Sequence, residues 1–183
     1  PYKVAAATYD GKSYSLPFDS GVAGLFYRSD YFEEAGFTAA DLENITWDRL
    51  LEIGTEVKAK TGHLLLDLDL NDNGLIRMMM QSSGEWFFND DGSLHILDNA
   101  PLKKALETYV KFYQADLVKP VSGWAEYTGS FTSGEIASVL VGVWITATIK
   151  ANADQSGLWA VAPIPRLDME GSVNASNLGG SSW

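Results

Sequence analysis

Two stretches about a hundred residues apart decide the fold: LPFDSGVAGLFYRSDYFEEAGF, residues 16–37, and FTSGEIASVLVGVW, residues 131–144. The first predicts a loop, a buried strand over residues 22–27 and a short helix over residues 30–35, which Ser29 caps and Gly36 ends. The second predicts a helix end, a buried strand over residues 136–141 and a tight glycine turn that presents Trp144. The strand ends of α/β folds are where such proteins bind ligands, so Trp144 stands at a favourable position.

The remaining sequence alternates strand and helix patterns, which predicts a mixed α/β domain. Thr46 is expected to cap a helix that ends at Thr61-Gly62, and Asn99 to cap a second one with Pro101 near its first position. We expect further strands over residues 12–18, 63–68 and 159–164, a helix over residues 75–82, a β-hairpin over residues 86–96, a loop and then a short helix over residues 123–133, and a helix over residues 145–152.

The amino-acid composition excludes several classes of function for this chain. The chain has 183 residues, 46% of them hydrophobic, and no apolar run long enough to span a membrane. Its net charge of −11 and lack of a basic cluster argue against nucleic acid and against anionic membrane surfaces. It has no cysteine, which excludes disulfides and thiolate metal sites. The start at Pro1 rather than Met suggests a processed form or an excised fragment.

Gly142-Val143-Trp144 is the motif with the clearest binding chemistry. A glycine at a strand end allows a sharp turn, and the indole that follows can stack on the apolar face of a pyranose ring. The alternative is a core tryptophan that covers the sheet edge.

The two opening stretches together resemble the carbohydrate-binding group of the extracellular solute-binding proteins of bacterial ABC importers, which includes maltose-binding protein. The similarity runs collinearly from about Asp10 to Trp183 and covers the middle half of a typical member. It implies one lobe of a two-lobe periplasmic-binding-protein type II-like fold, with a mixed sheet and flanking helices. Residues 1–18 would be a hinge-proximal strand with a remnant of the first lobe, residues 19–176 the second lobe, and residues 177–183 the return crossing of the hinge.

The resemblance also implies a function. The intact protein would hold a mono- or oligosaccharide in the cleft between its lobes, close by hinge motion, and deliver the sugar to the transmembrane subunits of an ABC permease. Such proteins are extracytoplasmic, in the periplasm or lipid-anchored at the cell surface, are not enzymes and need no cofactor. Many members of the family have the sequence Gly-Pro-Trp at the position that Gly142-Val143-Trp144 occupies in this chain.

Candidate sugar ligands follow from the positions that match the family. The stretch from Pro17 to Gly21 crosses between lobes in the family, so Asp19 and Ser20 would reach the cleft; a turn role for Asp19 is the alternative. Trp144 is the candidate for stacking, and Trp124 lies on a loop that borders the site in relatives. Asn71, Asn73 and Arg77 lie on the loop that opens a cleft-facing helix in the family, or just after it. Gly180 and Trp183 lie in the returning tail.

Residues 69–76, DLNDNGLI, imitate the first half of a calcium-binding EF-hand loop. The twelfth position of that loop would be Met80, which cannot ligate calcium, and the preceding segment has a strand pattern. We therefore expect no metal site, with Asp67 and Asp69 as weak candidates for a looser calcium site. A solvated turn is the simplest interpretation.

Catalysis has little support. His63 and His95 lie in strand-like runs without partners at metal-ligand spacing, and no nucleophile-elbow, P-loop or dinucleotide fingerprint is present. Two alternatives from other classes stay open: a glycoside hydrolase or other carbohydrate-active domain, and a calcium-dependent interaction module built on residues 67–73.

Overall fold

The computed structural model describes residues 2–183; Pro1, the first residue of the predicted hinge-proximal segment, lies outside it. The α-helices are α1 (Tyr2–Ala6), α2 (Ser29–Glu34), α3 (Trp47–Thr61), α4 (Gly74–Ser82), α5 (Ala100–Gln114), α6 (Gly123–Thr132) and α7 (Thr146–Lys150). Three short 3-10 turns are η1 (Ala39–Leu42), η2 (Val143–Ile145) and η3 (Ala153–Gln155). The strands are β1 (Thr8–Tyr9), β2 (Lys12–Ser13), β3 (Ala23–Arg28), β4 (Leu66–Asp69), β5 (Val118–Val121), β6 (Ser138–Gly142) and β7 (Trp159–Ala162).

A mixed sheet forms the centre of the body. Strand β3 lies between β6 and β7 and is antiparallel to both, while β4 and β5 are parallel. The backbone N–H groups of Ala137 and Ser138 donate to the carbonyls of Leu64 and Leu65, both at 2.8 Å, and so join the start of β6 to the chain entering β4. The predicted mixed α/β fold with flanking helices is confirmed.

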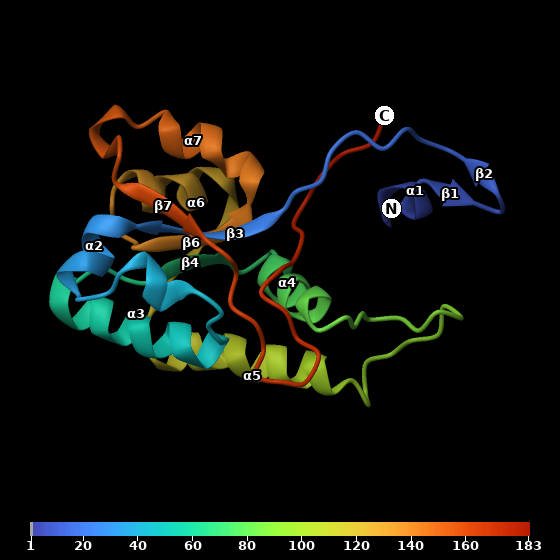
Figure 1. Cartoon of the computed structure of the whole chain (residues 1–183), viewed down its shortest axis with the longest axis horizontal. Helices are drawn as coiled ribbons and strands as arrows, with labels where there is room; N and C mark the ends of the chain where they lie inside the picture. The colour runs from blue at the N-terminus through green and yellow to red at the C-terminus, as the bar shows by residue number, and fades with distance from the viewer. Residues whose placement is uncertain (1) are drawn as a thin grey trace.

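Strand β3 is buried along its whole length because helices cover both faces of the sheet (Figure 1). Leu25 and Tyr27 point into the core that α2, α3 and α5 close. Phe26 points to the other face, where Phe131 of α6 and the helix α7 close a second cluster. The apolar stretch at residues 22–27 predicts such a buried run, but the strand begins one residue later, because Val22 is 58% exposed and pairs with the tail at Asn177.

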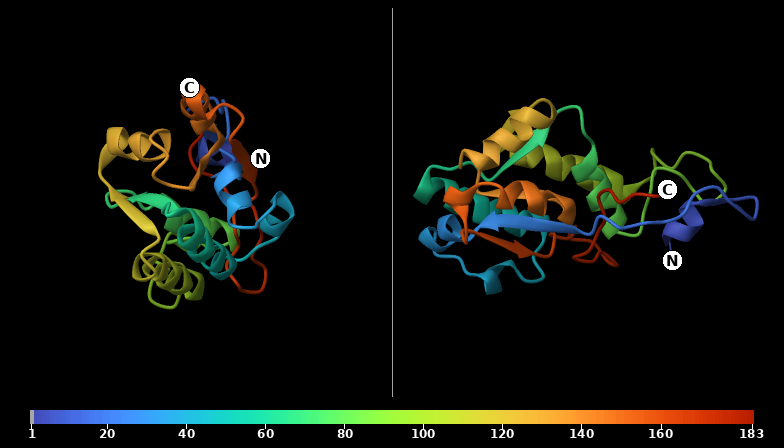
Figure 2. Two further views of the ribbon diagram at one scale, coloured as in Figure 1. Left: turned by 90° about the vertical axis from the view of Figure 1, so that its left-hand side faces the viewer. Right: turned by 90° about the horizontal axis from the view of Figure 1, so that it is seen from above.

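Both ends of the chain leave the body on the same side (Figures 1 and 2). Residues 16–23 run antiparallel to residues 176–183, with bridges from Pro17 to Ser182 and from Val22 to Asn177. Helix α1 and the small β1–β2 hairpin lie beyond this pair of strands, away from the sheet. No helix among residues 2–183 has both the length and the apolar character needed to cross a membrane.

Local signals predicted several elements closely. The Thr46 hydroxyl accepts from the N–H of Arg49 at 3.1 Å, and α3 ends at Thr61, directly before Gly62 with its φ of 77°. The Asn99 side chain accepts from the N–H of Leu102 at 2.9 Å at the start of α5.

Other predictions were wrong in detail. Ser29 does not cap α2, because it is the first residue of the helix and its hydroxyl donates to the carbonyl of Leu158. The strand expected over residues 12–18 is limited to β2, since the residues after it pair with the tail instead. The hairpin expected over residues 86–96 is reduced to one bridge between Phe88 and Leu94.

Candidate functional site

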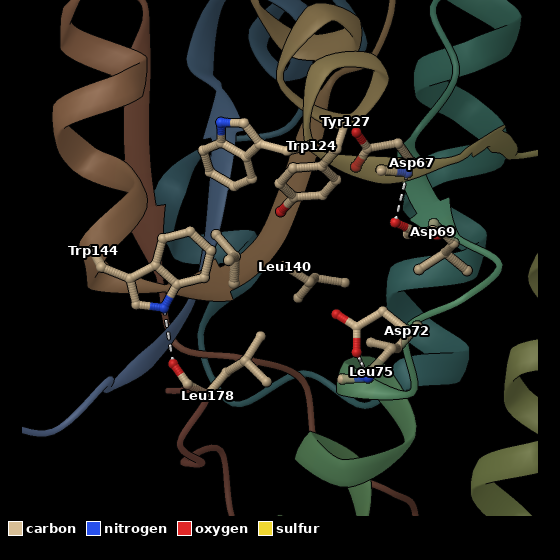
Figure 3. A pocket seen from close by; sticks show the side chains of 13 residues that line it. Asp67, Asp69, Asp72, Leu75, Trp124, Tyr127, Leu140, Trp144 and Leu178 are labelled. Carbon is tan, nitrogen blue, oxygen red and sulfur yellow. Dashed lines mark hydrogen bonds between the residues drawn. The ribbon is translucent and has the colours of Figure 1, made fainter. Parts of the chain in front are cut away.

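A cavity of about 190 Å³ opens between the carboxyl ends of β4 and β6 and the first turns of α4 and α6. One side carries three aromatic side chains, which we call the aromatic wall: Trp124, Tyr127 and Trp144. The other side carries three carboxyl groups, which we call the acidic wall: Asp67, which adjoins Tyr127, and Asp69 and Asp72 (Figure 3). Apolar side chains complete the cavity: Leu68, Leu75, Leu140, Val141 and Leu178.

Trp144 stands at the end of β6, where the expected glycine turn takes the form of the 3-10 turn η2. Its indole N–H donates to the carbonyl of Leu178 at 3.0 Å, and 45% of the residue stays exposed. A Cβ on Gly142 would lie 2.3 Å from the same carbonyl oxygen and 2.5 Å from the indole nitrogen. Gly142 is therefore needed for the close approach of the tail that fixes the ring.

The aromatic wall is continuous. The ring centroids of Trp124 and Trp144 are 5.9 Å apart with 37° between the planes, and those of Trp124 and Tyr127 are also 5.9 Å apart. Trp124 is 56% exposed. The exposed rings of Trp124 and Trp144, with Tyr127 beside them, form a surface on which a flat apolar face can stack.

Trp124 and Tyr127 lie on α6, and here the prediction of a loop followed by a short helix was wrong. The helix begins at Gly123, because carboxylates satisfy the N–H groups at its start. The N–H of Gly123 donates to Asp69 at 2.9 Å, and that of Ser122 donates to Glu126 at 2.8 Å.

The acidic wall is already hydrogen-bonded to the protein. Asp69 accepts through Oδ1 from the N–H of Asn71 at 2.9 Å and through Oδ2 from Gly123. These backbone donors hold the pKa of Asp69 below its usual value, with Asn71 the largest cause. Asp72 accepts from the N–H of Gly74, the first residue of α4, at 2.8 Å.

Asp67 differs from its two neighbours because it is buried, with 4% exposure. Its Oδ2 is hydrogen-bonded to the Ser130 hydroxyl, whereas Oδ1 has no partner among the described residues. Burial raises the pKa of Asp67 to about 7. Burial, followed by the charges of Asp67 and Asp72, raises the pKa of Tyr127 well above its usual value.

The geometry gives no support to the calcium interpretation. Both oxygens of Asp69 are occupied by backbone donors, and Met80 is fully buried in the core. Residues 2–183 contain no group of three or more His, Cys, Asp or Glu side chains placed to hold a metal ion.

The structure brings together some of the predicted site residues and not others. Trp144, Trp124 and Asp69 line the cavity, as does Asp67. Asn71 and Asn73 are exposed on the adjoining loop, with the Asn71 amide 3.3 Å from the Ser122 hydroxyl, and neither lines the cavity. Arg77 lies over the Trp86 ring, 5.7 Å from its centroid, and is likewise outside the lining.

The remaining candidates lie on the paired crossing segments. Asp19 accepts from the backbone N–H and the hydroxyl of Ser181, which lowers its pKa. Ser20 is exposed, Gly180 has a φ of 93°, and Trp183 packs edge-on against Phe18 at 5.8 Å. None of these four predicted residues lines the cavity.

Sequence reasoning missed Asp72 and Leu178 and did not commit to Tyr127. Asp72 had a local signal, since an Asp side chain often accepts from the backbone N–H two residues on, as it does here from Gly74. Leu178 had none, because only the return of the tail past Gly21 and Gly142 brings it to the site.

Comparison with known proteins decides the family. Residues 1–183 match the family described as "Bacterial extracellular solute-binding protein". The chain belongs to this family. It is a family of binding proteins, so the glycoside hydrolase alternative is wrong.

Individual relatives are consistent with that membership. The lactose-binding protein of Rhizobium radiobacter is 58% identical over 182 residues, which is 100% of this chain and 43% of the relative. A solved structure described as the ABC transporter associated binding protein from B. animalis subsp. lactis Bl-04 in complex with beta-1,6-galactobiose has a TM-score of 0.83 at 25% identity, covering 100% of this chain and 45% of that one. The sugar-binding protein MalE from Xanthomonas citri has the same fold, with a TM-score of 0.81 at 23% identity over 100% of this chain and 46% of that one. The chain thus spans less than half the length of these relatives.

Proposed function

We propose that this chain is most of the second lobe of a longer, two-lobe sugar-binding protein of an ABC importer. Residues 19–176 are the lobe, residues 1–18 lead in from the first lobe, and residues 177–183 return to it. The antiparallel pairing of residues 16–23 with 176–183 supports this division, because two adjacent strands are a natural hinge between rigid bodies.

The ligand we propose is a neutral mono- or oligosaccharide held between the lobes. The observation that carries the proposal is the Trp144 indole, fixed by its bond to Leu178 and half open beside Trp124. A pyranose ring has an apolar face that stacks on such a wall and hydroxyls that reach the acidic wall opposite. Lactose is the first sugar to test, given the 58% identical lactose-binding relative.

The charge of the cavity supports a neutral ligand. None of the described residues that line it is Lys, Arg or His, while three are Asp. Carboxylates accept hydrogen bonds from hydroxyls and repel anions.

Delivery to the transmembrane subunits of a permease, and a location outside the cytoplasm, complete the proposal. Both follow from what the family does and from the similarity to sugar-binding members. Asn71, Asn73 and Arg77 would border the closed cleft. The hinge-side candidates Asp19, Ser20, Gly180 and Trp183 would meet the ligand or the first lobe on closure.

The experiment is sugar binding by the intact protein that carries this chain. Melting temperature and tryptophan fluorescence are measured with lactose, β-1,6-galactobiose, arabinooligosaccharides and monosaccharides, because a ligand that binds the folded state stabilises it. We expect a sugar-specific shift that Trp144→Ala abolishes or strongly weakens. Trp159→Phe is the control, since Trp159 is half-buried and lies outside the cavity.

A folded protein that responds to no sugar would contradict the proposal. A response to a peptide or an osmolyte in the same assay would then identify a different solute class.

A further inference from the structure

Asp67 combines burial, a place in the cavity lining and an oxygen without a partner. It is 4% exposed and projects from β4 beside Tyr127 (Figure 3). Its Oδ1 is shielded from solvent and accepts no hydrogen bond from any described residue. An ionised carboxylate in that position would leave charge on an oxygen without a donor, which is costly in a protein interior.

The hydrogen-bond count at Ser130 favours a neutral carboxyl group. The Ser130 hydroxyl lies within bonding distance of Asp67 Oδ2 and also 2.8 Å from the backbone carbonyl of Tyr127. A hydroxyl has one hydrogen, so it can donate to only one of two acceptors. When Asp67 carries a proton on Oδ2, the carboxyl donates to Ser130, Ser130 donates to Tyr127, and both contacts are made.

The charged groups around Asp67 do not supply a free cation. On β5, Lys119 is the register partner of Asp67, but its ammonium group is paired with Glu135 at the turn before β6. Helix α6 presents Tyr127 and Glu126, and β6 presents no titratable side chain. On the side of Asp67 itself, Asp69 and Asp72 add negative charge to the same cavity.

We propose that Asp67 couples sugar binding to proton uptake, acting as a positioning residue that reaches the backbone carbonyl of Tyr127 through the Ser130 hydroxyl. The inference rests on the proposed function, since it needs a sugar in this cavity. A bound sugar replaces water in the adjoining cavity, which lowers the polarity around the already buried Asp67 and favours its neutral form. Proton uptake on binding means that affinity is highest when Asp67 is protonated and falls as the pH rises through the range in which it titrates.

The test is calorimetric titration of the intact protein with lactose between about pH 6 and pH 8.5, a range that spans the shifted pKa of Asp67. We expect roughly tenfold weaker binding at the upper end, as a one-unit rise in the pKa on binding would give. Repeating the titration in buffers of different ionisation enthalpy should show about half a proton taken up near the middle of this range, the maximum that a one-unit rise in the pKa gives. Without ligand, the side-chain carboxyl ¹³C signal of Asp67 should titrate near neutrality.

Two variants separate the roles of neighbouring carboxyl groups. Asp67→Asn places an amide donor opposite Ser130, as the neutral carboxyl does, so its affinity should no longer change with pH over this range. Asp69→Asn removes a carboxylate of the same cavity whose pKa is already lowered, so the pH dependence should persist.

The outcomes are distinct. Sugar binding that is independent of pH, a pH dependence that survives Asp67→Asn, or an Asp67 signal that titrates near its ordinary value of 3.8 overturns the proton linkage alone. Failure of every sugar to bind at any pH overturns the proposed function, and the linkage with it.

Discussion

The aromatic wall and the acidic wall face each other across one cavity but use their chemistry in opposite ways. In the aromatic wall, the indole N–H of Trp144 is anchored by Leu178 while the ring faces remain open. In the acidic wall, Asp69 and Asp72 direct their oxygens to the backbone N–H groups that begin α6 and α4. Trp144 is therefore held through its indole N–H and can still offer its ring to a ligand, whereas Asp69 and Asp72 already use carboxylate oxygens to accept backbone hydrogen bonds.

This difference indicates which side chains bind the ligand and which stabilise the structure of the site. Stacking on the aromatic wall needs no rearrangement, so its energy is available to the ligand. A carboxylate that already accepts two backbone hydrogen bonds gains less from a sugar hydroxyl, which must share or replace those donors. We therefore infer that the aromatic wall supplies most of the affinity and that Asp69 and Asp72 chiefly position the helices that carry it.

The largest effect is expected from Gly142→Ala. The added Cβ would lie 2.3 Å from the Leu178 carbonyl oxygen and 2.5 Å from the Trp144 indole nitrogen, so the tail or the ring must move. We expect more than a tenfold loss of sugar affinity and a loss of about 1–3 kcal/mol in unfolding free energy, as overpacking usually costs. Calorimetric titration and chemical denaturation measure the two quantities.

Gly129→Ala is the control for that substitution. Gly129 lies within α6, and a Cβ there would meet no atom within 4 Å. Alanine is the better helix former, so this variant should be as stable as the parent or slightly more stable. Equal losses in the two variants would show that the close approach at Gly142 has no special role.

An intermediate loss of sugar affinity is expected when the ligand carries a negative charge. Replacing a neutral disaccharide by the aldonic acid of the same sugar places a carboxylate near three Asp side chains. We expect several-fold to about tenfold weaker binding at low ionic strength, with the difference shrinking as salt is added. Competition against lactose measures the ratio, and an acid sugar that binds better than the neutral one would contradict the assignment.

The smallest effect is expected on stability, from Asp69→Ala. Losing the carboxylate removes the acceptor for the N–H groups of Asn71 and Gly123, and a melting temperature roughly 2–4 °C lower is typical for the loss of one helix cap. Because folding lowers the pKa of Asp69, its contribution is complete above the unfolded value of 3.8 and disappears as the pH falls through the folded value. Thermal melts of parent and variant should converge in acid; a constant difference at all pH values would contradict the helix-capping role.

The sequence predicted the parts of this site that local chemistry determines. The buried strand at residues 23–28, the capped helix α3 and the tryptophan at the end of β6 each depend on residues close together in the chain. The aromatic character of the site was therefore predictable from Gly142-Val143-Trp144.

The parts that it did not predict depend on distant partners. Helix α6 begins where it does because Asp69, 54 residues earlier, accepts from Gly123. The Ser29 hydroxyl turns to Leu158 rather than to its own helix, since β7 passes beside it. Asp67 looked like a weak metal candidate by spacing, whereas its burial against Ser130 makes it a protonation site.

The most direct test of the account compares one residue from each wall in the intact protein. Calorimetric titration with lactose is run on the parent, on Trp144→Ala and on Asp69→Asn under one set of conditions. The account predicts that Trp144→Ala weakens binding by roughly tenfold or more, the scale of a lost stacking contact, while Asp69→Asn weakens it by less than about threefold. A large loss for Asp69→Asn together with unchanged binding for Trp144→Ala would contradict it.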